Sequence, residues 1–274
     1  MRQFKLLLAA TAVFILSSAP AYAQKFNRAK GGSAPVMEKR IEWVTTSPGI
    51  SEQIIQHTGF VVSYNENLLI PNWVCWELTP EEAAGKLTLR TETVKPDPMV
   101  KGASARDADY SDSGYDKGFM APPADMKWSE KAMVESFYFS NVCPMKKDLN
   151  EGKWFELEQK CRYWAKKYKT SVYIACGPLF VRDEGYVIGE NEVVVPDAFF
   201  KCVCQERDGQ WVATGFVFPN TKLGSELKNL AKPFAVVEYL TGYKFFTNLP
   251  GTLHDELGLS INADDWDIPG WKTQ

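Results

Sequence analysis

Two short stretches in the middle of the chain decide the fold. The first is Asp116-Lys117-Gly118-Phe119-Met120-Ala121-Pro122, and the second is Asn150-Glu151-Gly152-Lys153-Trp154-Phe155-Glu156-Leu157-Glu158. From the second stretch onward, apolar side chains recur at steps of three and four as far as Tyr168. This spacing predicts an amphipathic helix from about Glu151 to Tyr168. If that helix already begins at Asn150, Glu158 lies two turns further on, about 12 Å along the helix axis.

Asn150 and Glu158 are a candidate pair of ligands for a divalent cation. An amide offers a neutral oxygen and a carboxylate a charged one, but two side chains that far apart cannot both touch one ion. A hydrated Mg²⁺ suits such a gap because this ion usually keeps several of its waters. Two ordinary interpretations stay open for the pair alone: Asn150 caps the helix, and Glu158 is a solvated surface acid.

The segments on either side predict both strands and helices. Strands are expected at residues 60–64 (half-buried), 72–78 and 171–176 (ended by Gly177-Pro178), and at 199–206 and 211–218, which form a hairpin around Asp208-Gly209. Helices are expected to start at residues 79–82 and to cover residues 236–240. We therefore predict an α+β fold with a central, mostly antiparallel sheet flanked by helices. Residues 95–128 form a long polar segment, and long loops in compact domains often carry function.

Together these segments resemble the DNA/RNA non-specific endonucleases of the ββα-metal class. That family carries D-R-G-H followed by an apolar residue and A-P, then S-N-x-x-P-Q, then N-x-G-x-W-x-x-L-E. The chain matches the pattern in its two deciding stretches and at Ser140-Asn141, and the resemblance spans about residues 41–260. It implies the ββα-metal nuclease fold. It also implies cleavage of phosphodiester bonds in DNA or RNA with the help of Mg²⁺ or Mn²⁺.

The resemblance further implies roles for single residues. Asn150 would bind the metal directly, Glu158 would hold it through water, and Asn141 would order the loop of the active site. Lys117 takes the place of a phosphate-binding arginine, which keeps the charge but loses the planar fork of donors. Arg90 would match a second phosphate-binding arginine, and an ordinary surface arginine is the alternative.

Phe119 is the main departure, because it stands where the family has its catalytic histidine. A phenyl ring can neither take nor give a proton, and a general base is typically worth about 10²–10⁴-fold in rate. The chain has only two histidines, His57 and His254; both are far from this motif in sequence, and we expect both to be structural. Three hypotheses follow: a slowed endonuclease, a catalytically dead pseudo-nuclease that binds nucleic acid or a protein partner, and a hydrolase of another phosphodiester.

Charge narrows the way in which nucleic acid could bind. The 274 residues carry a formal net charge of −3, which excludes a protein that coats nucleic acid through an overall positive field. Phosphate binding must then come from a local cluster, for which Lys146, Lys147 and Lys153 are candidates.

The first residues predict export. A charged start, an apolar run from Leu6 to Leu16 and the sequence Ala21-Tyr22-Ala23 are typical of a secretory signal peptide over residues 1–23. We expect residues 24–40 to be a flexible leader and residues 41–270 to form the nuclease-like domain. The protein would be periplasmic or secreted, without a stable membrane anchor. The six cysteines leave disulfides and buried free thiols equally open.

Overall fold

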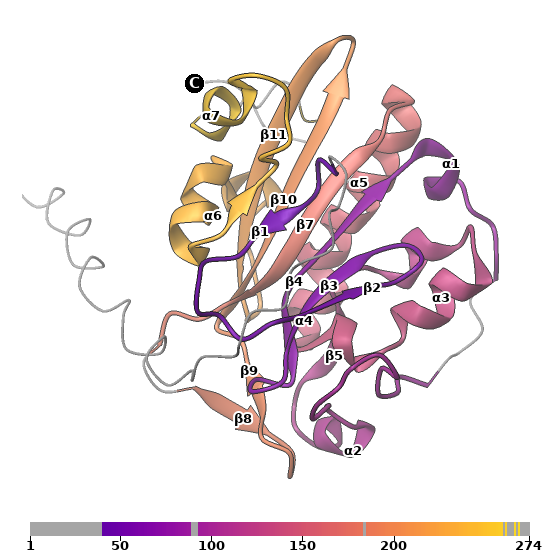
Figure 1. The fold of residues 1–274 in the computed structure, drawn as a ribbon, viewed down its shortest axis with the longest axis vertical. Helices are drawn as coiled ribbons and strands as arrows, with labels where there is room; N and C mark the ends of the chain where they lie inside the picture. Colours follow the sequence, from indigo (N-terminus) through magenta and orange to yellow (C-terminus); the bar gives the residue numbers. More distant parts are fainter. Residues whose placement is uncertain are drawn as a thin grey trace, which may run out of the picture.

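A seven-stranded sheet forms the centre of the molecule (Figure 1). The computed structural model describes residues 40–88, 93–182 and 185–259, together with residues 261, 266 and 268. In the order of pairing, the strands are β12 (Ala231–Lys232), β11 (Gln210–Pro219), β10 (Ala198–Arg207), β7 (Val172–Leu179), β4 (Ile70–Leu78), β3 (Val61–Asn65) and β2 (Gln53–Gln56). Every neighbouring pair in this sheet runs antiparallel, as the sequence predicted.

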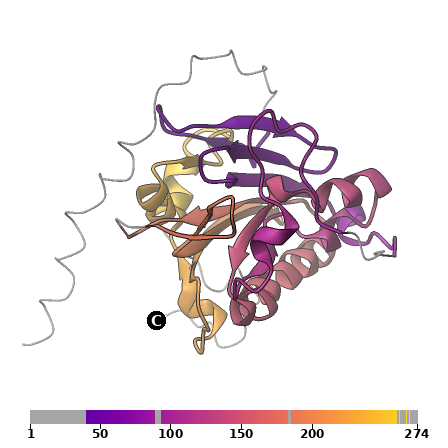
Figure 2. The same cartoon turned by 90° about the horizontal axis from the view of Figure 1, so that it is seen from below.

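Helices cover both faces of this sheet. Alternate residues of a strand point to opposite faces, so Phe199 packs into one apolar cluster and Phe200 into the other. The first cluster is closed by α5 (Phe155–Tyr168) and α3 (Glu130–Ser136). The second is closed by α6 (Phe234–Thr241) and by β1 (Val44–Thr45), which pairs with β13 (Lys244–Phe245). The protein is thus layered as helix, sheet and helix (Figure 2).

A separate two-stranded ribbon carries the first deciding stretch. It pairs β5 (Asp116–Phe119) with β6 (Val142–Met145) in antiparallel fashion, so that Lys117 lies opposite Pro144. The chain then passes through α4 (Lys147–Leu149) and a π-helical turn, η4 (Asn150–Trp154), into α5. Two strands followed by a helix are the ββα arrangement that the resemblance implied.

The remaining elements are short. They are α1 (Pro80–Ala83), α2 (Asp107–Tyr110), η2 (Pro123–Met126), η3 (Phe139–Asn141), η5 (Leu227–Leu230), α7 (Leu253–Gly258) and the hairpin of β8 (Tyr186–Ile188) with β9 (Val193–Val195). Helix α1 begins with the expected cap, because the Thr79 hydroxyl accepts from the Glu82 amide and the Glu82 carboxylate accepts from the Thr79 amide. The hairpin of β10 and β11 also lies where the sequence placed it.

Three local expectations were wrong. Strand β7 continues through Gly177-Pro178 to Leu179, because pairing with β10 sets Phe199 opposite Pro178. A Cβ at Gly177 would come within 2.5 Å of the Asn72 carbonyl oxygen, so only glycine fits that crossing. Strand β3 is buried on both faces rather than one. The regular helix begins at Phe155 rather than Glu151, since Gly152 takes a non-helical backbone conformation.

All six cysteines are buried free thiols, which settles the choice between thiols and disulfides. The predicted signal peptide and residues 24–39 of the predicted leader lie outside the described residues. Within the described part of the chain, no helix has the length and apolar character to cross a bilayer. The bounds of the nuclease-like domain, residues 41–270, stay a prediction.

Candidate active site

A cleft opens beside the β5–β6 ribbon, between α2 and the π-helical turn. It has a volume of about 360 Å³. The residues that line it are Asp107, Tyr110, Ser111, Tyr115, Asp116, Lys117 and Asn150. Two of the predicted site residues, Lys117 and Asn150, are therefore brought together although they lie far apart in sequence. Most of the other lining residues come from the long polar segment that the sequence analysis singled out.

Lys117 is not free in the cleft. Its ammonium forms an ion pair with the Asp107 carboxylate, and both side chains are partly exposed. The pair cancels much of the positive charge that Lys117 would offer to a phosphate. Binding of a phosphodiester through Lys117 would require the ammonium to exchange the carboxylate for a phosphate oxygen.

Asn150 faces Asp116 across the cleft. The Asn150 Nδ2 atom lies 3.4 Å from Asp116 Oδ2, which is a long, weak hydrogen bond. Asn150 ends α4, and Trp154 takes the N-cap position of α5, so Asn150 does not cap the start of that helix. An amide and a carboxylate side by side are the hard oxygen donors that Mg²⁺ prefers. The chemistry of this donor pair fits a divalent cation.

Such a cation would take few ligands from the protein. Across the described ranges, no group of three or more His, Cys, Asp or Glu side chains could hold a metal ion. Magnesium tolerates this situation, because it is often bound by one or two protein oxygens and completes its shell with water and substrate phosphates.

Glu158 is not among the residues that line the cleft. Its side chain is only about 9% exposed, so it is not a solvated surface acid. Its carboxylate lies 4.0 Å from the Lys201 ammonium, and that ammonium stands 3.9 Å from the centre of the Trp154 ring. Burial raises the pKa of Glu158 to about 7 against the opposing pull of Lys201. Among the described residues, Lys201 Nζ has no hydrogen-bond acceptor, so Glu158 is its nearest compensating charge.

Phe119 does not line the cleft. Its ring packs edge-on against Phe137, with the ring centres 5.3 Å apart. Its carbonyl oxygen accepts a hydrogen bond of 3.1 Å from Trp154 Nε1, which ties β5 to the start of α5. The backbone of the motif is thus held in place, while its side chain at this position is apolar and packed.

Asn141 ties the loop after β5 to the end of α3. Its Oδ1 accepts from the Ala121 amide at 2.9 Å, and its Nδ2 donates to the carbonyls of Ala121 and Ser136. Its neighbour Ser140 donates to the buried Asp97 carboxylate at 2.6 Å. These contacts are the ones expected of a residue that orders the loop, and the role itself stays a prediction.

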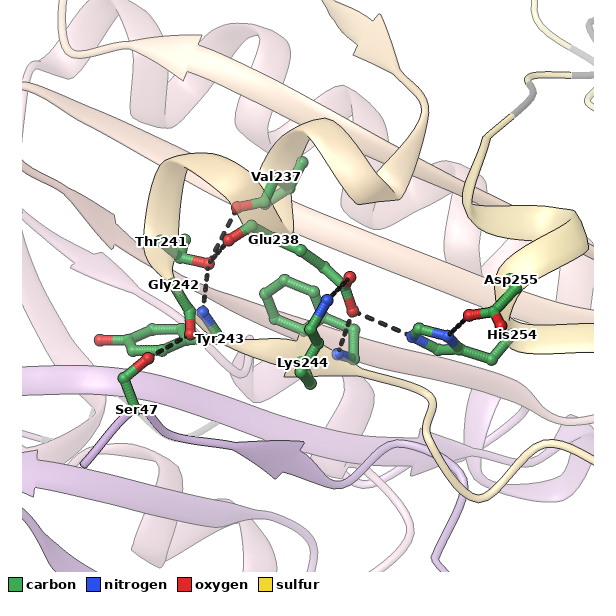
Figure 3. A network of polar contacts seen from close by, with 10 residues as sticks. Ser47, Val237, Glu238, Thr241, Gly242, Tyr243, Lys244, His254 and Asp255 are labelled. Carbon is green, nitrogen blue, oxygen red and sulfur yellow. Dashed lines mark hydrogen bonds and ion pairs between the residues drawn. The ribbon is translucent and has the colours of Figure 1, made fainter. Parts of the chain in front are cut away.

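Both histidines lie in structural networks away from the cleft. His57 Nε2 is 2.9 Å from Asp97 Oδ2, and the His57 side chain is almost fully buried. His254 stands between Glu238 and Asp255, at 3.0 and 2.9 Å (Figure 3). The same buried Glu238 carboxylate accepts from Lys244, so it joins α6, β13 and α7. Neither histidine lines the cleft, and both take the structural positions that the sequence predicted.

Four further cations were predicted to bind phosphate, and the structure describes three of them. Arg90 lies outside the described residues. Lys147 and Lys153 pair with Glu151 and Glu156 on the outside of the helical segment. Of these cations that the structure describes, Lys146 lies nearest the cleft: its ammonium stands 3.8 Å from the centre of the ring of Tyr115, which lines the cleft.

Sequence reasoning missed Asp107, Tyr115 and Lys201. Asp107 and Tyr115 sit in a polar segment without periodicity, and nothing in their spacing from Lys117 marks them as neighbours. Lys201 carried a usable signal: it interrupts an apolar strand at a position where a charge must be buried and paired.

The chain resembles known nucleases in sequence and in structure. Residues 39–252 match the model of the DNA/RNA non-specific endonuclease family. The chain is 33% identical over 210 residues to the mitochondrial nuclease EXOG of Mus musculus, covering 71% of this chain and 57% of that protein. It is 34% identical over 215 residues to the mitochondrial endonuclease G of Homo sapiens, covering 74% and 72%. A chain in the crystal structure of the EndoG/EndoGI complex aligns with a TM-score of 0.69 and 28% identity, covering 73% of this chain and 87% of that one.

These comparisons also correct the predicted localisation and show how much of its relatives' length the chain covers. The assignment to the periplasm or to secretion is wrong, since the curated relatives, including the mitochondrial nuclease of Saccharomyces cerevisiae, are mitochondrial. The alignments to the EXOG proteins of Mus musculus and Danio rerio cover 57% and 60% of those proteins, so the chain spans less than two thirds of their length.

Proposed function

The chain belongs to the DNA/RNA non-specific endonuclease family, and from this premise we propose that it is a metal-dependent, sequence-tolerant endonuclease whose cutting is impaired. One observation carries the proposal. The cleft gathers Asp116, Lys117 and Asn150 at the junction of the β5–β6 ribbon with the helical segment, which is the part of the fold where the family pattern lies. The substrate class is DNA or RNA.

Each residue has a defined task in this proposal. Asn150 would hold a Mg²⁺ or Mn²⁺ ion through its amide oxygen, with Asp116 beside it, and Glu158 would support the hydrated ion through water. When bound, the ion neutralises charge on the phosphate and makes water a better nucleophile. Lys117 leaves Asp107 to contact a phosphate oxygen, and Asn141 keeps the loop at Ala121 in position.

The impairment follows from Phe119. A packed phenyl ring cannot remove a proton from the attacking water, and the loss of a general base typically lowers the rate by about 10²–10⁴-fold. Lys117 adds a smaller loss, because an ammonium contacts a phosphate at one point where a guanidinium grips it at two.

A second candidate is a binding module that holds nucleic acid without cutting it. The specific observation in its favour is that both histidines of the chain are engaged elsewhere, with Asp97 and with Glu238. In that case the cleft binds phosphate and cation, and no side chain completes the chemistry.

Digestion of plasmid DNA and of RNA by the full-length chain tests the proposal. Slow cutting that requires Mg²⁺ or Mn²⁺ and stops with EDTA is the expected result, and binding without cutting would select the binding module. A small phosphodiester such as bis(p-nitrophenyl) phosphate serves as a third substrate. Its preferential hydrolysis would contradict a nucleic-acid substrate.

Calorimetry with Mn²⁺ tests the metal site separately. Asn150→Ala should abolish binding, and Glu158→Ala should weaken it less. The matched control is Asn229→Ala, because Asn229 is exposed and lies outside the cleft. Equal affinity in the wild type and in Asn150→Ala would overturn the metal assignment.

A further inference from the structure

An exposed aromatic rim borders the cleft. Strand β8 holds Tyr186 and Val187 at 50% and 40% exposure, which is unusual for large apolar side chains on a strand. The Tyr186 ring centre lies 6.1 Å from that of Tyr115, and Tyr115 itself lines the cleft. The Lys146 ammonium lies 3.8 Å from the Tyr115 ring centre and donates to the Gly114 carbonyl. We call Tyr115, Lys146 and Tyr186 the rim.

The hairpin that carries Tyr186 is firmly anchored. Ile188 and the three residues of β9 pack into the core. At the turn, the buried Asp109 carboxylate accepts hydrogen bonds from the Asn191 backbone and side chain, at 3.0–3.1 Å. Asp109 belongs to α2, which also forms a wall of the cleft, so the hairpin and the cleft are tied to one residue. Tyr186 is therefore presented on a fixed support, as a binding platform requires.

Charge alone gives this cleft little hold on nucleic acid. The chain is acidic overall, and the Lys117 ammonium is already paired with Asp107. A cleft whose lysine is already paired can gain affinity from the bases instead, since aromatic side chains stack on bases of any sequence. In a duplex the base faces are covered by their neighbours, so stacking of this kind selects unpaired bases.

We propose that the rim is a stacking platform for an unpaired base of single-stranded DNA or RNA. Tyr186 stacks on the base, Tyr115 supports Tyr186, and Lys146 contacts the adjoining phosphate. This inference rests on the proposed function, because the strand that stacks at the rim continues into the cleft. It adds a substrate class, single strands and unpaired ends, that the family assignment does not specify.

Fluorescence anisotropy with the full-length chain in EDTA tests the platform without cutting. The probes are a labelled 12-nucleotide single strand, an abasic strand of the same length and charge, and the blunt duplex. The wild type should bind the base-carrying strand about tenfold more tightly than either other probe. Tyr186→Ala should remove this preference and leave abasic binding unchanged, while Tyr186→Trp should keep it. Tyr239→Ala, a change at an exposed tyrosine on α6, should have no effect.

Two results would overturn the platform alone: equal wild-type affinity for the base-carrying and abasic strands, or an equal loss on both strands in Tyr186→Ala. Equal or tighter binding of the duplex would overturn the preference for single strands. Failure of the folded wild type to bind any of the three probes would overturn the proposed function as well. Melting temperatures of the variants establish that each one is folded.

Discussion

Strand β5 and helix α5 hold the two halves of the candidate site in different ways. On β5, Lys117 and Phe119 are partly exposed. The Lys117 ammonium pairs with Asp107, and the Phe119 ring packs against Phe137 at the edge of the core. At the start of α5, Trp154 and Glu158 are almost fully buried, and both lie about 4 Å from the Lys201 ammonium, at 3.9 Å (ring centre) and 4.0 Å. A side chain can change on β5 at small cost to folding, whereas a change around Lys201 disturbs the core.

The difference teaches what a match to the family pattern means. Two departures from the pattern, Lys117 and Phe119, lie on β5, and a third, Met145 in place of glutamine, lies on the paired strand β6. The helical stretch from Asn150 to Glu158 agrees with the pattern. Trp154 fastens β5 to the helix and Glu158 balances a buried charge, so packing alone is a reason to keep them. Their presence indicates the fold more strongly than it indicates active chemistry.

The largest effect should come from the buried charge. Above pH 7, where the Glu158 carboxyl is ionised beside Lys201, Lys201→Met removes the partner of a buried charge, and breaking a buried ion pair typically costs about 3–5 kcal/mol. Urea unfolding should show a loss of that size in the free energy of unfolding. The double variant Lys201→Met with Glu158→Gln should recover most of it, because no charge is then left unpaired. A loss below about 1 kcal/mol for Lys201→Met would contradict the contrast between strand and helix.

Restoring the base on β5 should have the next largest effect. Phe119→His should raise the rate of plasmid cutting by about 100-fold, because an imidazole can take the proton from water. Adding Lys117→Arg should raise it further through bidentate contact with the phosphate. Phe119→Leu is the matched control and should cut no faster than the wild type.

Two outcomes would correct this account of β5. A wild type that already cuts as fast as Phe119→His would show that the phenyl ring is no obstacle. A folded double variant that binds Mn²⁺ and cuts nothing would place the loss beyond residue 119 and favour the binding module.

The buried Asp97 carboxylate, which accepts a hydrogen bond from Ser140 beside Asn141, should contribute to stability in a pH-dependent way. Burial alone would raise the pKa of Asp97, but hydrogen bonds from His57, Ser140 and the Met99 amide outweigh it and hold the pKa below its ordinary value. A carboxyl group with a lowered pKa stabilises the fold above its ordinary pKa, near 3.8, and this contribution is lost as the pH falls through the lower folded value.

Asp97→Asn should therefore cost about 2 kcal/mol at pH 7, the scale of hydrogen bonds to a charged group, and progressively less in acid below pH 4. Denaturant titrations at several pH values measure the difference in the free energy of unfolding between the wild type and Asp97→Asn. Asp208→Asn, at the exposed turn of the β10–β11 hairpin, is the control and should show no such trend. If the loss of stability in Asp97→Asn is the same at every pH, the negative charge of Asp97 does not contribute to the stability of the fold.

The smallest effect concerns Lys117. If its ammonium contacts a phosphate, Lys117→Ala should lower the slope of log affinity against log salt by about one unit. The exposed Lys222 serves for comparison, and Lys222→Ala should leave the slope unchanged. An unchanged slope in both variants would mean that Lys117 remains with Asp107 in the complex.

Local patterns predicted local structure well. The cap at Thr79, the turn at Asp208-Gly209 and the helix ending at Tyr168 depend on neighbours in sequence, and the structure has all three. The end of β7 was misplaced because a distant strand, β10, holds Gly177-Pro178 in the sheet.

The site was predicted only as far as the family pattern reached. It marked Asn150, Lys117 and Phe119, but it is silent on Asp107, which reaches Lys117 only through the fold. The position of Tyr186 beside Tyr115 likewise depends on Asp109 and Asn191, residues far apart in sequence. Such contacts are set by packing over long distances, which periodicity and spacing do not record.

The burial of every thiol makes this protein suitable for site-specific labelling. Burial raises the pKa of Cys161 and of Cys176 to about 12, and the other four thiols are shifted upward as well. At neutral pH a maleimide dye finds neither an accessible sulfur nor a thiolate among them. A single cysteine introduced at the exposed Glu190, in the turn of the β8–β9 hairpin, would then be the only position to react. A fluorophore there would follow the arrival and departure of a nucleic-acid strand in real time.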